Sequence, residues 1–185
     1  MPRWGPDAED RLYRSAMQLI LDRGYDEVTV AEIAEHAGLT KRSFFRHYAD
    51  KREVMFAGAT EFQAGIVEAV RTAPGSTPPI EVVVSALTAA GSGLVAWGEV
   101  TRRRQRMVAS STELRERELI KMDTLTAAVA GALRERDVEA LTAELVARAG
   151  VAVFVTAFQR WTEAAEPADF PALMDAALAR LREAV

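Results

Sequence analysis

The chain has 185 residues, of which 49% are apolar and 27% charged, with no cysteine and a formal net charge of −4. This length suits one medium-sized domain or two small ones with a substantial buried core. The lack of cysteine excludes disulfides, thiolate metal sites and cysteine nucleophiles, and it favours a cytoplasmic location. The net negative charge disfavours a protein that coats nucleic acid or membrane with its whole surface.

Helical patterns follow one another from the start of the chain. The first repeats apolar residues at three- and four-residue spacing and stops at Gly24. Thr29 and Glu32 then have the spacing of a capping box, which predicts a short helix that ends at Gly38. The sequence therefore predicts two helices within the first forty residues.

Two more helix starts follow. Thr40 is suited to cap a helix through "KRSFFRHY", and Asp50 with Glu53 repeats the capping-box pattern. The second of these starts predicts one long helix over about 51–72. The segment "APGSTPP" at 73–79 is the clearest break in the chain, and five helical patterns follow it. The whole chain is therefore predicted to be all-α.

Positive charge is concentrated between Leu39 and Arg52, where five cationic side chains face a single carboxylate, a local charge of +4. Two short helices joined by a three-residue turn with glycine, the second of them cationic, are the outline of a helix-turn-helix. Phe44 and Tyr48 are four residues apart and are predicted to face the core. The opposite side of this helix is then left to Lys41, Arg42, Phe45 and Arg46.

The stretch "TVAEIAEHAGLTKRSFFRHYADKREVMF", preceded by "AMQLILDRGYDEVTV", resembles the DNA-binding domain of the TetR family of bacterial transcriptional regulators over about residues 7–60. "RSFFRHY" is similar to a subgroup common in actinobacteria, and "ELRERELIKMDTLTAAVAGALRER" resembles the regulatory half of that subgroup. The resemblance implies a three-helix, helix-turn-helix DNA-binding domain at 1–50. It also implies a helical ligand-binding and dimerisation domain at 51–185, with the 51–72 helix connecting the two.

The resemblance also implies roles for individual residues. Lys41, Arg42 and Ser43 occupy the base-facing start of the recognition helix. Positions that commonly touch phosphate or sugar in the family are occupied by Thr29, Phe45, His47 and Lys51. Apart from the resemblance, we expect further phosphate contacts from Arg46 and from the backbone at Thr40. Where the family often has tyrosine this chain has Phe45, so contact with sugar or a thymine methyl replaces a phosphate hydrogen bond.

A second basic cluster, "RRRQR" at 102–106, is an alternative DNA-binding surface. Five consecutive helical positions face all round the helix axis and cannot form one flat contact. We therefore expect some of these arginines to pair with acids such as Glu113, Glu116 and Glu118, while an anionic ligand at Arg103 or Arg106 remains an alternative.

The second half is predicted to serve pairing and sensing. Apolar residues at helical spacing suit a four-helix interface with a second copy, although ordinary internal core is the alternative. The predicted interface comprises Val151, Phe154, Val155, Phe158, Leu173, Leu178 and Leu181. Large or flexible side chains, with a few polar anchors, are the candidates for an effector pocket. These are Phe62, Leu94, Trp97, Met107, Met122, Thr126, Phe158, Gln159 and Trp161.

Together with these patterns, the resemblance implies a homodimeric repressor that binds a pseudo-palindromic operator in double-stranded DNA and is released by a small apolar or amphipathic effector. No cofactor, metal or membrane is expected. A DNA-binding module that ignores ligands is one alternative. An enzyme in the second half is less favoured, because both histidines lie in the first domain and no phosphate-binding glycine loop is present.

Overall fold

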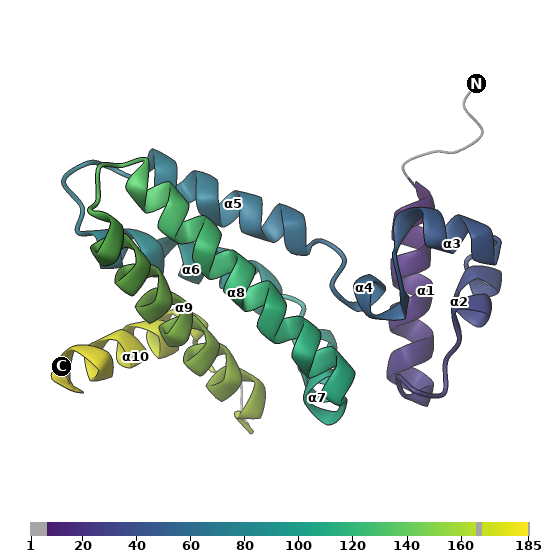
Figure 1. The fold of residues 1–185 in the computed structure, drawn as a ribbon. Coiled ribbons are helices and arrows are strands. Elements are labelled where there is room, and N and C mark those ends of the chain that lie inside the picture. The colour runs from purple at the N-terminus through teal and green to yellow at the C-terminus, as the bar shows by residue number, and fades with distance from the viewer. Residues whose placement is uncertain (1–6, 166–167, 185) are drawn as a thin grey trace. The chain divides into compact units, whose positions relative to one another are not determined.

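The computed structural model describes residues 7–165 and 168–184, and every regular element in those ranges is an α-helix (Figure 1). The all-α prediction is confirmed. The described chain forms two compact units. The first unit runs up to Ala59 and also includes Arg103–Glu118, and the second comprises Thr60–Arg102 and Leu119–Val185.

The first unit contains α1 (Asp7–Arg23), α2 (Val30–His36), α3 (Lys41–His47) and α4 (Lys51–Met55). Its core is made by fully buried side chains from all four helices, among them Leu12, Ile20, Ile33, Phe44 and Met55. Val108 and Leu114, from much later in the chain, are buried in the same core. The first unit is therefore larger than residues 1–50, because Val54, Met55 and Phe56 also belong to its core.

The predicted single helix over about 51–72 is interrupted. α4 ends at Met55, and α5 (Ala59–Thr72) begins only after a turn. Gly58 in that turn has a φ of +80°, a left-handed conformation that ends an α-helix and suits glycine. Phe56 is buried in the core of the first unit, whereas Ile66 and Val70 are buried in the second. The break therefore lies where the chain leaves one core for the other.

The second unit contains most of α5 together with α6 (Pro79–Val95), α9 (Ala140–Glu163) and α10 (Phe170–Ala184). α6 begins at a proline, as the "APGSTPP" segment predicted. α7 (Glu99–Ser110) and α8 (Thr112–Arg134) each belong partly to both units, since the divisions fall after Arg102 and after Glu118.

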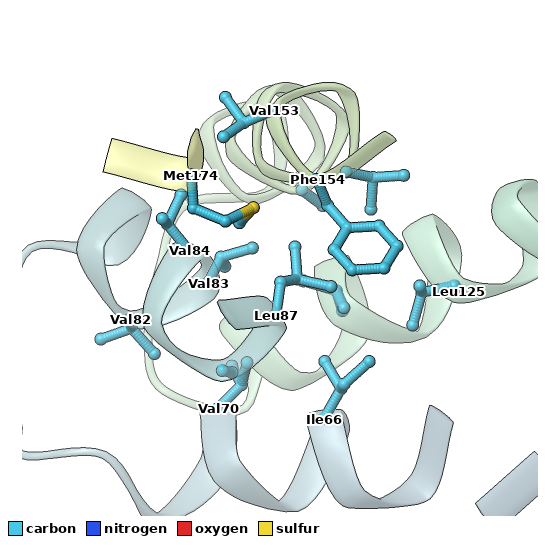
Figure 2. Close-up of a cluster of buried hydrophobic side chains, with 14 of the residues drawn as sticks. Ile66, Val70, Val82, Val83, Val84, Leu87, Leu125, Val153, Phe154 and Met174 are labelled. Atoms are coloured by element: carbon cyan, nitrogen blue, oxygen red, sulfur yellow. The ribbon is translucent and has the colours of Figure 1, made fainter. Parts of the chain in front are cut away.

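Figure 2 shows the core of this unit, where Leu87 of α6, Phe154 of α9 and Met174 of α10 meet. Two glycines allow the helices to approach closely. A Cβ atom at Gly150 would collide with Val83, and one at Gly91 would collide with the Phe170 ring. α6, α9 and α10 therefore form one tightly packed group.

By length and composition alone, α9 is one described helix that is apolar enough to cross a membrane. The core helix of a soluble protein meets the same criteria. One side of α9 is buried against α6 and α10, from Ala143 through Gly150 and Ala157 to Trp161. Its apolar character is thus accounted for in part by packing within the second unit.

Candidate nucleic-acid interface

The start of α2 is held by the predicted capping box. The Thr29 hydroxyl accepts a hydrogen bond from the Glu32 backbone N–H at 3.2 Å, and the Glu32 carboxylate accepts one from the Thr29 N–H at 2.8 Å. Hydrogen bonds from the backbone and hydroxyl of Thr29, with a smaller contribution from Arg23, lower the pKa of Glu32 to about 2. Thr29 is therefore occupied in positioning α2.

α3 is anchored by its aromatic side. Thr40 caps the helix by accepting a hydrogen bond from the Ser43 N–H at 3.1 Å. Phe44 and Tyr48 are both buried, with ring centroids 5.5 Å apart, as their spacing predicted. One ring from the middle of α3 and one from the residue that follows the helix therefore lie in the core, and this fixes which side of α3 faces outward.

The outward side of α3 carries Lys41, Arg42, Phe45 and Arg46, all of which are exposed. Phe45 is 48% exposed, and the Lys41 ammonium lies 5.9 Å from the centre of its ring. Three cations and one apolar ring therefore share one face of a short, firmly held helix. This combination suits phosphates, base edges and thymine methyl groups.

The structure corrects the position of Ser43. Its side chain is buried, and its hydroxyl lies 2.9 Å from the Thr40 hydroxyl. The helix cap explains the difference, because Ser43 is the third residue of α3 and both its N–H and its hydroxyl meet the Thr40 side chain. Ser43 thus supports the start of α3 and does not face outward as a base contact would.

Two residues that were predicted to contact DNA phosphate instead contact protein groups within the first unit. The Lys51 ammonium donates hydrogen bonds to the carbonyls of Tyr25 at 2.7 Å and Val28 at 3.0 Å, and it lies 4.0 Å from the centre of the Tyr25 ring. The His47 ring lies 3.9 Å from the Glu9 carboxylate. Lys51 therefore holds the loop between α1 and α2 in place. Its two acceptors lie about 25 residues earlier in the sequence.

Arg11 is a residue that sequence reasoning missed. Its guanidinium donates hydrogen bonds to the carbonyls of Ala37 and Gly38, in the turn between α2 and α3. Gly38 has a φ of +66°, and a side chain there would also meet Arg11. The sequence around Arg11 does not predict this role, because Ala37 lies 26 residues further along the chain.

The "RRRQR" cluster does not form one surface. Arg103 donates to the Leu21 carbonyl at 2.7 Å, and Arg104 donates two hydrogen bonds to the Met55 carbonyl at 2.9 and 3.0 Å. The Arg102 guanidinium instead lies over the Trp161 ring. These three arginines are held by backbone carbonyls, by the Trp161 ring and, for Arg103, also by the Asp22 carboxylate at 3.7 Å. None of the three is held by Glu113, Glu116 or Glu118 in these contacts.

Three further contacts hold α4 within the first unit. Asp50 caps the helix by accepting from the Glu53 N–H, and the neighbouring Arg52 helps to hold the pKa of the Asp50 carboxyl below its ordinary value. Arg52 also pairs with Glu113 at 3.3 Å, and Arg117 donates to Glu53 at 2.9 Å. The beginning of α8 is thus linked to the beginning of α4.

The predicted pocket residues are distributed unevenly. Phe62, Phe158 and Trp161 belong to a cluster of rings in the second unit, and Met122 packs against the same core. The Thr126 hydroxyl donates to the Met122 carbonyl, and the exposed Gln159 donates to Glu163. Trp97 is 73% exposed and Leu94 is exposed at the same end of α6.

Met107 is a correction. It packs against the core of the first unit beside Val108, so it does not share the apolar cluster around Phe158. The reason is that the division between the units falls inside α7, after Arg102. A helical pattern alone contains no sign of such a division.

The predicted interface residues need a similar correction. Phe154 is 4% exposed, and Val151 and Leu178 are also buried in the protomer's own core, while Phe158, Leu173 and Leu181 are partly buried against it. Val155 is exposed at 42%. Of the predicted set, Val155 is the residue whose side chain stands free for a partner. The most apolar side of α9 is used for folding the protomer.

Two family models match the chain in sequence. Residues 12–57 match bacterial regulatory proteins of the tetR family, and residues 77–185, more than half of the chain, match the MftR C-terminal domain. The chain belongs to the tetR family of bacterial regulatory proteins. Members and relatives of this family are transcriptional regulators and not enzymes.

A curated relative is the HTH-type transcriptional regulator TcmR of Streptomyces glaucescens, 34% identical over 80 residues. That match covers 43% of this chain but only 35% of the relative. Among solved structures, Thermus thermophilus FadR in complex with lauroyl-CoA has a TM-score of 0.61 at 24% identity, covering 95% of this chain and 93% of that one. The SmeT–triclosan complex has a TM-score of 0.67 at 18% identity, covering 94% and 90%. These two structures share the fold.

Proposed function

We propose that this tetR-family regulator is a homodimeric repressor that binds a pseudo-palindromic operator through α3 and leaves it when a small effector binds the second unit. The observation that carries the proposal is the division of α3 into two sides. Phe44 and Tyr48 are buried, whereas Lys41, Arg42 and Phe45 are exposed. A helix held in this way can enter the major groove with its cationic side toward the bases.

Separate roles are assigned to the exposed residues. Lys41 and Arg42, in the first turn of α3, read base edges, because their donors suit the acceptors of guanine. Phe45 contacts a sugar or a thymine methyl group, while Arg46 and the backbone at Thr40 contact phosphates. Thr29 contributes by ordering the start of α2, because its N–H already donates to Glu32. The phosphate contact of His47 stays a prediction, because its Nδ1 atom lies near Glu9 and its Nε2 atom is buried. Lys51 contributes mainly by ordering the α1–α2 loop, which its two carbonyl contacts support.

The dimer interface is proposed on the outward side of α9 and α10. Leu141 and Leu145 are 61% and 58% exposed, and Val155 continues their line along α9. On α10 the exposed positions Ala172, Ala176 and Ala179 are small and follow helical spacing. Exposed apolar side chains beside small residues allow two helices from each copy to pack closely.

The effector is proposed to be mainly apolar. The rings of Phe62, Phe158 and Trp161 support this, because they offer stacking surface and few polar groups. Two proteins of the same fold are described in complex with lauroyl-CoA and with triclosan, ligands that both carry a large apolar part. The subgroup suggested by "RSFFRHY" stays a prediction.

Release from DNA is proposed to run through α7. A two-fold dimer must hold its recognition helices roughly 34 to 36 Å apart to fit successive major grooves. Arg104 donates a hydrogen bond to the carbonyl of Met55 at the end of α4, and Arg102 on the same helix belongs to the second unit. An effector that shifts α7 would therefore disturb α4, and DNA and effector would weaken each other's binding equally.

The test is a selection of bound fragments from genomic DNA, repeated with a panel of apolar metabolites. A recovered sequence with two-fold symmetry, lost in the presence of a metabolite, is the expected result. Operator affinity that no compound changes would support the ligand-independent module instead. Because the target is chromosomal DNA, the proposal includes a cytoplasmic location.

A further inference from the structure

Arg102 differs from the other arginines of the second unit. Its Nε atom is buried and has no hydrogen-bond partner among the described residues. Its guanidinium carbon lies 4.7 Å from the centre of the Trp161 ring. By contrast, Arg71, Arg148 and Arg182 each pair with a carboxylate, although all three are more open to solvent.

Trp161 is one end of a row of aromatic rings. Its centroid lies 5.9 Å from that of Phe158, which lies 5.7 Å from that of Phe154, and Phe62 of α5 follows at 6.2 Å. Three of these rings come from one side of α9, at positions separated by three and four residues. Arg102 therefore stands at one end of a row of rings in which Phe154 and Trp161 are buried and Phe62 and Phe158 are partly exposed.

A cationic side chain with a buried N–H group and no anion beside it loses hydration at that group, and the ring face compensates only part of that cost. The ring interacts with the flat face of the guanidinium and leaves the buried, in-plane Nε–H group without an acceptor. Buried donors in folded proteins are almost always paired, so an unpaired one calls for a missing acceptor. The two oxygens of a carboxylate match the edge of a guanidinium better than one hydroxyl does.

We propose that Arg102 binds the carboxylate of an amphipathic effector whose apolar part lies along the row from Trp161 to Phe62. This inference rests on the proposed function, because it names the chemistry of the effector at the same site. The carboxylate accepts hydrogen bonds from the Arg102 guanidinium, and the apolar part of the effector contacts the uncharged rings. An alcohol of the same shape lacks the charge, and an amine is repelled by the cation.

The experiment uses matched pairs of ligands with the full-length protein. Decanoate, 4-phenylbutanoate and 2-naphthoate are compared with decan-1-ol, 4-phenylbutan-1-ol and 2-naphthalenemethanol by calorimetry without DNA. At least one acid is expected to bind clearly better than its alcohol. In Arg102→Leu, affinity for that acid should fall about ten- to a hundredfold, the usual effect of losing hydrogen bonds to a charged group, while affinity for the alcohol changes little.

The matched control is Arg160→Leu, which removes an exposed arginine beside Trp161 on the same helix. It should leave the preference for the acid unchanged. If all three acids bind no better than their alcohols, or if both variants lose affinity alike, the proposal is overturned.

A second measurement separates ligand binding from a merely structural role. Removing a charged side chain whose buried Nε–H group is unpaired should leave the melting temperature of the ligand-free protein unchanged or raise it, and only the stabilisation by the acid should disappear. A large fall in the melting temperature of ligand-free Arg102→Leu, with full stabilisation by the acid retained, would contradict the proposal. Operator binding by wild type and variant tests the regulator itself, so the two failures are distinguishable.

Discussion

The Arg104 guanidinium donates two hydrogen bonds to the carbonyl oxygen of Met55, at the end of α4, and lies 5.1 Å from the centre of the Phe56 ring. Burial lowers the pKa of Arg104, but the group stays charged at neutral pH. One side chain thus joins α7 to the last turn of α4 within the first unit.

Replacing Arg104 should therefore weaken the first unit. Arg104→Leu leaves the Met55 carbonyl without its donors, and we expect a loss of about 1 to 3 kcal/mol in the free energy of unfolding. Arg115→Leu, which removes an exposed arginine of the same unit, is the control and should change little. Urea unfolding measures both. Equal stability of the two variants would show that the hydrogen bonds between Arg104 and the Met55 carbonyl do not stabilise the first unit.

Lys41 and Arg42 should determine sequence preference. Changing either to alanine is expected to cost about 1 to 3 kcal/mol on the best operator and to relax the preference at particular base pairs. Arg134→Ala, at an exposed position of the second unit, serves as the control. Titrations on operator and on scrambled DNA provide the measurement. Losses of the same size on both DNAs would mean that the two residues contact only phosphate.

Lys51→Ala should act on stability before it acts on DNA. The substitution removes the ammonium that joins the carbonyls of Tyr25 and Val28, and a loss of about 1 to 3 kcal/mol is expected. The salt dependence of operator binding should change less than it does for Arg46→Ala, since each released phosphate contact alters the log–log slope by about 0.9. If Lys51→Ala keeps wild-type stability and the slope falls sharply, its main partner is phosphate.

Two neighbouring residues of α9 distinguish surface from core. Val155→Asp places a charge on an exposed position and should yield soluble monomers, because an unpaired charge is costly only once the partner covers it. Phe154→Asp places the charge inside the protomer and should yield unfolded or insoluble protein. Sedimentation and circular dichroism report the two outcomes. If Val155→Asp remained a soluble dimer, Val155 would not lie in the dimer interface.

The capping box at Thr29 predicts a pH dependence. The pKa of Glu32 falls from its ordinary 4.5 to about 2 on folding, so its stabilising effect is complete above pH 4.5 and is lost as the pH falls toward 2. Glu32→Gln removes the charge at every pH. Its melting temperature should therefore lie below that of wild type at pH 7 and approach it near pH 2.5. A gap that stays constant over this range would contradict the assignment.

The elements that the sequence predicted well depend on near neighbours along the chain. The capping box of Thr29 and Glu32, the buried pair Phe44 and Tyr48, and the start of α6 at Pro79 all involve residues at most four positions apart. Helical geometry alone brings such residues together. The same local logic placed Lys41, Arg42 and Phe45 on one outward face.

Tertiary structure decided the features that depend on distant partners. Ser43 is buried against the Thr40 hydroxyl, and Phe154 is buried in the core of its own protomer. The Lys51 ammonium donates to carbonyls of the loop between α1 and α2. Arg104 found its acceptor 49 residues away. A periodic apolar pattern shows that a helix face is buried, but it does not show which surface buries it, because the hydrophobic effect has no direction along the chain.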